Sequence, residues 1–126
     1  MKLRSSGEDY LKAIYVLQKS KGFVRSVDVS DYMDVSKPSV SHAVKLLREG
    51  GFVVMNEDNT LHLTEVGQEI AEKVHERYQY FAKHLSGAGV DSAVAEKEAC
   101  RMEHTISDDS FQKLKERKQS ECPFAD

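Results

Sequence analysis

The sequence predicts a mainly α-helical protein with one β-hairpin near its middle and further helices after it. Three observations support this prediction. Apolar residues recur every three to four positions over most of the 126 residues, as they do along the buried side of helices. Ser or Thr begins most of these segments, where its side chain can cap a helix. Between residues 52 and 63, short apolar runs flank the polar turn 56–59, which is typical of a hairpin.

The composition is that of a soluble globular protein, with 40% hydrophobic and 31% charged residues. The chain contains no apolar run approaching the ~18 residues that a membrane span requires. Its first residues lack the apolar core of a signal peptide, so we expect a cytoplasmic protein. Cys100 and Cys122 are too few for a disulfide framework and should stay reduced.

The net charge of −3 argues mildly against a nucleic-acid ligand, but the charges are unevenly distributed. Residues 1–63 contain nine Lys and Arg against eight Asp and Glu, whereas residues 64–126 contain nine against thirteen. The first half is therefore the half that could face phosphate groups, provided that its basic residues cluster.

The first half predicts three helices. The first covers about 7–18, with Ser6 as its cap and Gly22 as its stop. Two short helices follow, with caps at Ser26 and Ser36 and a tight turn at 34–35 between them. In the first of the two we expect an inward face of Val27, Val29 and either Tyr32 or Met33. Helix, short turn and helix form a helix-turn-helix motif.

The outer face of the second short helix is polar, with hydroxyl groups near its start and basic residues further along. This pattern suits a recognition helix, whose first turns reach base edges while Lys and Arg neutralise phosphates. An ordinary solvated face remains an equally simple explanation of this helix alone. The predicted DNA-contacting residues are Arg25, Ser36, Lys37, Pro38, Ser39, Ser41, His42 and Lys45.

The hairpin that follows favours DNA binding, because a helix-turn-helix with a hairpin after it is a winged helix. Its strands are expected at 52–55 and 61–63. Glu57 and Asp58 at its tip would be repelled by phosphate, so this wing should contact DNA lightly.

The second half predicts a long helix over 65–85 capped by Thr64, whose buried face includes Val66 and Val74. A helix from Asp91 or Ser92 to about His104 and a short one after Ser107 follow. Thin apolar faces on these two helices indicate dimerisation. The predicted organisation is a winged-helix DNA-binding domain over 1–70, a helical dimerisation and metal-binding domain over 71–119, and a loose tail over 120–126.

Cys100, Glu103 and His104 would share one face if their segment is helical. A thiolate, a carboxylate and an imidazole suit a first-row ion such as Fe(II), Mn(II), Co(II) or Zn(II) better than Ca or Mg. On a charged amphipathic helix the three can also coincide by chance. The prediction needs a fourth ligand from elsewhere in the chain.

The chain resembles the diphtheria-toxin-repressor family of metal-dependent transcriptional regulators, which includes the manganese transport regulators. The resemblance covers roughly residues 5–118. It rests on the segments Gly7-Glu8-Asp9-Tyr10-Leu11, Val35-Ser36-Lys37-Pro38-Ser39, Leu63-Thr64-Glu65-Val66-Gly67 and Glu98-Ala99-Cys100-Arg101-Met102-Glu103-His104. It implies a metal site formed by Asp9, Cys100, Glu103 and His104. The chain stops before the SH3-like domain of longer members.

Several positions depart from the family pattern. Lys12 stands where manganese-type members have Glu, Tyr78 stands at the family's His, and Ala82 and Glu96 occupy second-site positions. The resemblance therefore favours one metal ion per subunit over two, with Lys12 supplying positive charge where a second ion would sit. His75, one turn before Tyr78, is a weaker candidate ligand.

The resemblance implies a homodimeric regulator that represses metal-uptake genes and is activated by Mn(II) or Fe(II). An ion that joins Asp9 to the dimerisation domain would fix two reading heads about 34–36 Å apart on a palindromic operator. Cys100 favours Fe(II), and Asp9 favours Mn(II).

Three alternatives stay open at this point. The first is a winged-helix regulator with a degenerate metal site, which is constitutive or answers another signal. The second is an enzyme with Cys100 as nucleophile and His104 as base, although nothing in the sequence supplies an oxyanion hole. The third is a protein-interaction module without salt-dependent DNA affinity.

Overall fold

The computed structural model describes residues 5–117, and the chain divides into two compact units, one ending at Glu76 and the other beginning at Arg77. The predicted loose tail at 120–126 lies outside the described residues. No helix within 5–117 is both long and apolar enough to cross a membrane.

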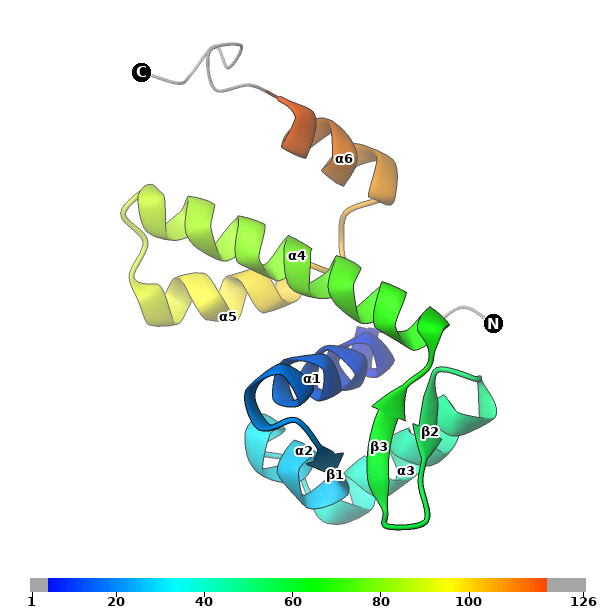
Figure 1. Cartoon of the computed structure of the whole chain (residues 1–126). Helices are drawn as coiled ribbons and strands as arrows, with labels where there is room; N and C mark the ends of the chain where they lie inside the picture. Colours follow the sequence, from blue (N-terminus) through cyan, green and yellow to red (C-terminus); the bar gives the residue numbers. More distant parts are fainter. Residues whose placement is uncertain (1–4, 118–126) are drawn as a thin grey trace. The chain divides into compact units, whose positions relative to one another are not determined.

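The first unit is a helix-turn-helix with a small sheet and the start of a long helix (Figure 1). Its elements are α1 (Ser5–Lys21), β1 (Val24–Arg25), α2 (Ser26–Met33), α3 (Lys37–Glu49), β2 (Val53–Met55), β3 (Thr60–Leu63) and the first part of α4 (Glu65–Gly87).

The sheet of the first unit has three antiparallel strands in the order β1-β3-β2. Leu61 of β3 pairs with Val24 on one side and with Met55 on the other. The hairpin of β2 and β3 was predicted, whereas β1 was not. A strand of two residues carries no alternating pattern, and its partner is more than thirty positions away in sequence.

One apolar core holds the first unit together. Leu11, Ile14, Val29, Val40 and Leu61 are wholly buried and come from α1, α2, α3 and β3. Burial of such side chains stabilises a fold by roughly 1.5–3 kcal/mol each, so the core fixes α3 against the sheet. The outer face of α3 is thereby held toward solvent.

The long helix α4 is anchored to the hairpin at its first turn. The Thr64 hydroxyl donates to the Gly51 carbonyl (2.7 Å) and accepts from the Gly67 amide (3.1 Å). The Thr64 amide donates to the Phe52 carbonyl (3.0 Å). Thr64 therefore caps α4, as predicted, and ties it to the start of β2.

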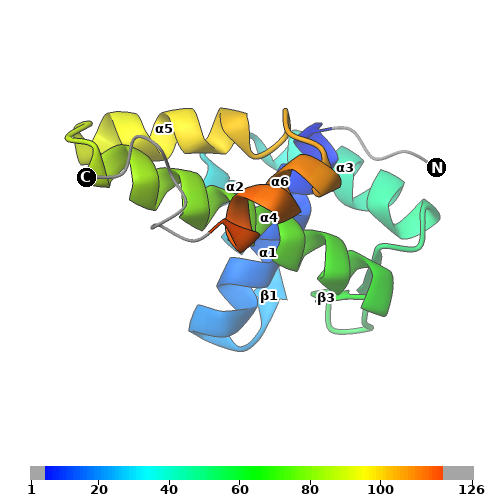
Figure 2. The ribbon, with the colours of Figure 1, turned by 90° about the horizontal axis from the view of Figure 1, so that it is seen from above.

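The second unit contains the rest of α4 together with α5 (Ser92–Met102) and α6 (Asp108–Glu116). Figure 2 shows α5 beside the C-terminal part of α4. Phe81 of α4, Ala99 of α5 and Phe111 of α6 are buried together. Asp91 caps α5 and Ser107 caps α6, each by accepting a hydrogen bond from a backbone amide.

Two expectations about burial were wrong. Val27 is 43% exposed and Val66 is 52% exposed, although both were placed on inward faces. In α2, the buried Val29 lies about 200° around the helix from Val27. In α4, the first turn directs Gly67 rather than Val66 at the hairpin, because Gly67 lies against the Phe52 backbone.

Candidate nucleic-acid interface and metal-ligand segment

The predicted DNA-contacting residues lie in the first unit, and all eight are exposed. Six of them, from Lys37 to Lys45, belong to α3. Ser36 is its N-cap: the hydroxyl accepts from the Ser39 amide (3.2 Å) and donates to the Ser39 hydroxyl (2.8 Å). Arg25 stands at the N-cap of α2, with its guanidinium over the Phe23 ring at 5.8 Å.

A basic hollow lies between α3 and β2. Its lining contains Lys45 and Arg48, one acidic residue (Glu49) and the strand residues 53–55. Basic residues were predicted on the outer face of α3 beyond its first turns, and Lys45 and Arg48 are exposed residues of that part of the helix. The lining of the hollow shows that Lys45 and Arg48 also lie beside the wing strand β2. There they could neutralise DNA phosphates that approach α3 or β2.

Hydrogen bonds hold one acidic residue of the wing tip, Asp58, in place. The Asp58 carboxylate accepts hydrogen bonds from the Thr60 hydroxyl (2.6 Å) and the Thr60 amide (3.1 Å). These bonds lower the pKa of Asp58 below its ordinary value, so the carboxylate stays charged. A charged tip would be repelled by phosphate, and light contact of the wing with DNA stays a prediction.

Glu103 and His104 form a close pair of candidate ligands in the second unit. Glu103 is the C-cap of α5 and is wholly buried, and its Oε1 lies 3.2 Å from Nε2 of His104. Two ligand atoms held about 2.1 Å from one ion lie about 3.0–3.4 Å apart in octahedral or tetrahedral geometry. The pair therefore has a spacing that a divalent ion can use.

The burial of Glu103 supports this fit. A carboxylate is seldom completely buried unless a cation, a hydrogen-bond donor or a metal accompanies it. One oxygen and one nitrogen donor suit first-row ions in general and do not discriminate between Mn(II) and Fe(II).

Cys100 is placed differently from this pair. It lies on α5 and is exposed, whereas Glu103 is buried. The helix ends at Met102, so the expected single helical face from Cys100 to His104 stops short of its last member. His104 follows in a turn, where its amide donates to the Arg101 carbonyl at 3.4 Å.

Asp9 lies in the first unit, on α1, and is half-buried. Lys12 lies one turn further along and is only 9% exposed. His75 also belongs to this unit, with its ring 5.6 Å from that of Tyr15. Burial lowers the pKa of His75, and the charges of Lys12 and Lys19 lower it further.

Three of the positions at which the resemblance places a second metal site, Tyr78, Ala82 and Glu96, line one groove of the second unit. This groove, of about 550 Å³, runs between α4 and α5 and is bordered by Tyr78, Gln79, Ala82, Lys83, Ser86, Ser92 and Glu96. Among these residues Glu96 is the sole carboxylate, and Lys83 brings a positive charge. The lining is therefore a poor set of ligands for a divalent ion.

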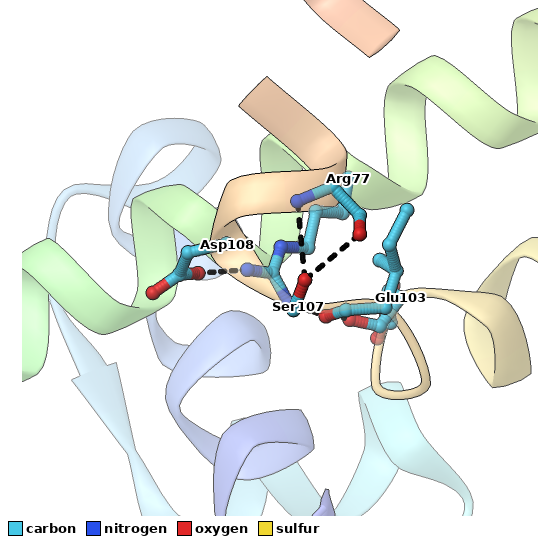
Figure 3. A network of polar contacts seen from close by, with 6 residues as sticks. Arg77, Glu103, Ser107 and Asp108 are labelled. Atoms are coloured by element: carbon cyan, nitrogen blue, oxygen red, sulfur yellow. Dashed lines mark hydrogen bonds and ion pairs between the residues drawn. The ribbon is translucent and has the colours of Figure 1, made fainter. Parts of the chain in front are cut away.

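The sequence reasoning missed Arg77. Its side chain donates to the backbone carbonyls of Glu103 (3.4 Å) and Ile106 (3.0 Å) and forms an ion pair with Asp108 (Figure 3). These partners lie 26 to 31 positions away in sequence, so no local pattern could reveal them.

The chain matches two family models that together span most of its length. Residues 2–61 match the N-terminal DNA-binding domain of iron-dependent repressors, and residues 64–123 match their metal-binding and dimerisation domain. The chain therefore belongs to the iron-dependent repressor family of metal-dependent transcriptional regulators, which is a family of regulators and not of enzymes.

Individual relatives agree with the two models. The HTH-type transcriptional regulator MntR of Shouchella clausii is 30% identical over 109 residues, which cover 86% of this chain and 76% of that protein. The solved structure of the manganese regulator SloR is 30% identical and has a TM-score of 0.75. A manganese-dependent transcriptional repressor in complex with manganese is 25% identical, with a TM-score of 0.76.

The chain spans about half the length of these two solved chains. It covers 53% of the SloR chain and 50% of the manganese-bound repressor, while 90% and 86% of its own residues are matched.

Proposed function

We propose that this chain is a homodimeric repressor of metal-uptake genes, activated by Mn(II) or Fe(II). The observation that carries the proposal is the wholly buried Glu103 carboxylate beside the His104 imidazole. It lies within the part of the chain that matches a metal-binding and dimerisation domain. Such a regulator would work in the cytoplasm, where the chromosome is.

The proposed ligands of the ion are Asp9, Cys100, Glu103 and His104, with one ion per subunit. Asp9 belongs to the first unit and the other three to the second, so a shared ion would fix the DNA-binding unit on the dimerisation unit. The poor ligand set of the groove around Tyr78 and Glu96 supports a single ion.

In this proposal the ion supplies positive charge that holds donors of two units together. The remaining work falls to the chain itself. In α3, Ser39, Ser41 and His42 would approach base edges, while Lys37 and Lys45 would neutralise phosphates. A palindromic operator would present two half-sites about 34–36 Å apart to the two heads of a dimer.

The proposal is tested by measuring metal content and DNA affinity on the same preparation. A pool of random duplexes is first enriched with the full chain and Mn(II), and the enriched duplex then serves as operator. At fixed salt we expect one ion per subunit and an affinity about 5- to 150-fold higher with Mn(II) or Fe(II) than with chelator. Equal affinities would contradict the proposal.

One alternative remains, a winged-helix regulator with a degenerate metal site. The exposure of Cys100 and the Lys side chain at position 12 favour it. It predicts no stoichiometric ion by elemental analysis and no effect of Glu103→Gln on DNA affinity. The same two measurements therefore separate the two functions.

A further inference from the structure

We propose that Arg77 is the positioning residue of the metal-ligand pair Glu103 and His104. The inference rests on the proposed metal-binding function of this pair and adds a residue that acts through the backbone. Arg77 lies on α4, whereas the pair lies on the link between α5 and α6, residues 103–107.

The link needs an outside donor because it joins two helix ends. The last carbonyls of a helix have no partner within it. Glu103 is the C-cap of α5, and its carbonyl accepts from Nη1 of Arg77 at 3.4 Å. The Ile106 carbonyl, just before the Ser107 cap of α6, accepts from the same nitrogen at 3.0 Å. One guanidinium thus holds both ends of the link.

A third contact extends the hold to α6. Nη2 of Arg77 donates to the carboxylate of Asp108, the first residue of that helix (Figure 3). The Asp108 side chain is 74% exposed, while that of Arg77 is 13% exposed. The carbonyl contacts are therefore more sheltered from water than the ion pair, and we assign to them the larger part of the stabilisation of the link by Arg77.

Packing fixes the guanidinium itself. Its central carbon lies 5.6 Å from the centre of the Phe111 ring, and Phe111 is buried with Phe81 and Ala99. A planar guanidinium presents its donors in a rigid fork, so an immobilised one sets the direction of each bond that it makes. The link is consequently held in one arrangement.

The arrangement of the link decides where the two ligand atoms lie. Glu103 carries both the carbonyl that Arg77 holds and the buried carboxylate, and His104 is the next residue. Groups that orient metal ligands typically change metal affinity about 10- to 100-fold when they are removed. Arg77 is placed to have such an effect without touching the ion.

The test compares three variants of the full chain by anaerobic titration with Co(II), whose absorption spectrum reports ligand geometry. Arg77→Lys keeps the charge but loses the fork. We expect its Co(II) affinity to fall about 10- to 100-fold with an altered spectrum. Asp108→Asn keeps the carbonyl contacts and should lose affinity only on the order of a few-fold. Lys113→Met breaks an exposed ion pair with Asp109 on α6 and should bind as the wild type does.

A second readout uses the metal-free protein. Hydrogen exchange of the amides of 103–107 should be faster in Arg77→Lys than in the wild type, while the amides of α1 and α3 should be unchanged. If Arg77→Lys does not fold, Asp108→Asn is used instead: a loss of Co(II) affinity on the order of a few-fold, with faster exchange of the amides of 103–107, supports the inference, and wild-type affinity and exchange in this variant would overturn it. Wild-type affinity, spectrum and exchange in the folded Arg77→Lys protein would overturn the inference. Failure of the wild type to bind Co(II) would instead overturn the proposed function and the inference with it.

Discussion

An acidic and a basic side chain of this protein are buried, and the free energy that their burial costs depends on the groups around them. Glu103 is wholly buried yet lies beside His104, and Lys12 is nearly buried on α1. Such groups are seldom placed inside a protein for stability, because desolvation offsets much of their attraction. In the proposed function, the buried carboxylate is a ligand of the ion.

His75 makes stability depend on pH. Its pKa is lowered by burial and by the charges of Lys12 and Lys19. The unfolded chain takes up a proton below a pH of about 6.5, while the folded chain resists protonation. The His75 contribution to the free energy of unfolding should therefore be complete above pH 6.5 or so and decline as the pH falls toward the lowered pKa.

This pH effect is measured by urea unfolding of the metal-free protein between pH 7.5 and 5, at about half-unit steps. His75→Gln should flatten the curve in that window, because a neutral amide replaces the titrating ring. His62→Gln, on the half-exposed face of β3, is the matched control and should keep the wild-type curve. An equal slope in His75→Gln and the wild type would refute the assignment.

At the scale of the elements, caps and glycines define where helices begin and stop. Ser36, Thr64 and Ser107 were predicted as caps, and in each case the hydroxyl accepts from a backbone amide. Gly22 was predicted as a stop, and its φ of 89° is one that L-residues seldom adopt. Local signals of this kind are readable because cap and helix are neighbours in sequence.

Gly67 of α4 lies against the backbone of Phe52, the residue just before β2. A Cβ at this position would lie 2.0 Å from the Phe52 carbonyl oxygen. Gly67→Ala should therefore destabilise the first unit by about 1–3 kcal/mol or more, because backbone must move. Thermal unfolding measures the loss.

Gly87, the last residue of the same helix, is the matched control for Gly67. A Cβ there would meet nothing within 4 Å. Gly87→Ala should leave stability unchanged or raise it by up to about 1 kcal/mol. A Gly67→Ala protein as stable as the wild type would show that α4 does not lie against Phe52 as described.

The helix α3 yields a prediction about salt. Lys45 is exposed beside the wing strand, and we expect it to neutralise one phosphate. Lys45→Ala should weaken binding to all duplexes alike and reduce the slope of log affinity against log salt by about one. The slope is obtained by titrating the enriched duplex at several salt concentrations.

The control for Lys45 is Lys97→Ala, an exposed lysine of α5 in the second unit. Lys97→Ala should have the same slope of log affinity against log salt as the wild type. An unchanged slope for Lys45→Ala would show that Lys45 does not neutralise a DNA phosphate.

The sequence predicted the helices, the hairpin and the caps Ser36 and Thr64, but not the features that depend on distant partners. Ser26 was also predicted as a cap, whereas it is the first residue of α2 and Arg25 is the N-cap. The strand β1 exists because Val24 and Arg25 pair with β3, and Arg77 holds a link about thirty positions away. The placement of Cys100 outside the buried pair was equally unforeseen. Helical spacing predicts the direction of a side chain around one helix, but it does not predict where the helix ends. Because α5 ends at Met102, His104 lies beyond it.

At the scale of the whole molecule, the chain combines a DNA-binding unit with a unit that carries candidate metal ligands. One family model matches residues 2–61 and the other matches residues 64–123. A ligand can change DNA affinity only by binding one arrangement of the molecule better than another. In the proposed function, an ion held in part by Glu103 and His104 therefore controls DNA affinity.

The most direct test is fluorescence anisotropy of the enriched duplex with the wild type and Glu103→Gln, each with Mn(II) and with chelator at one salt concentration. Glu103→Gln keeps the shape and polarity of the buried side chain and removes its charge. We predict that Mn(II) raises the affinity of the wild type about 5- to 150-fold and leaves that of the variant at the chelator value. A variant that responds to Mn(II) as strongly as the wild type would contradict the account.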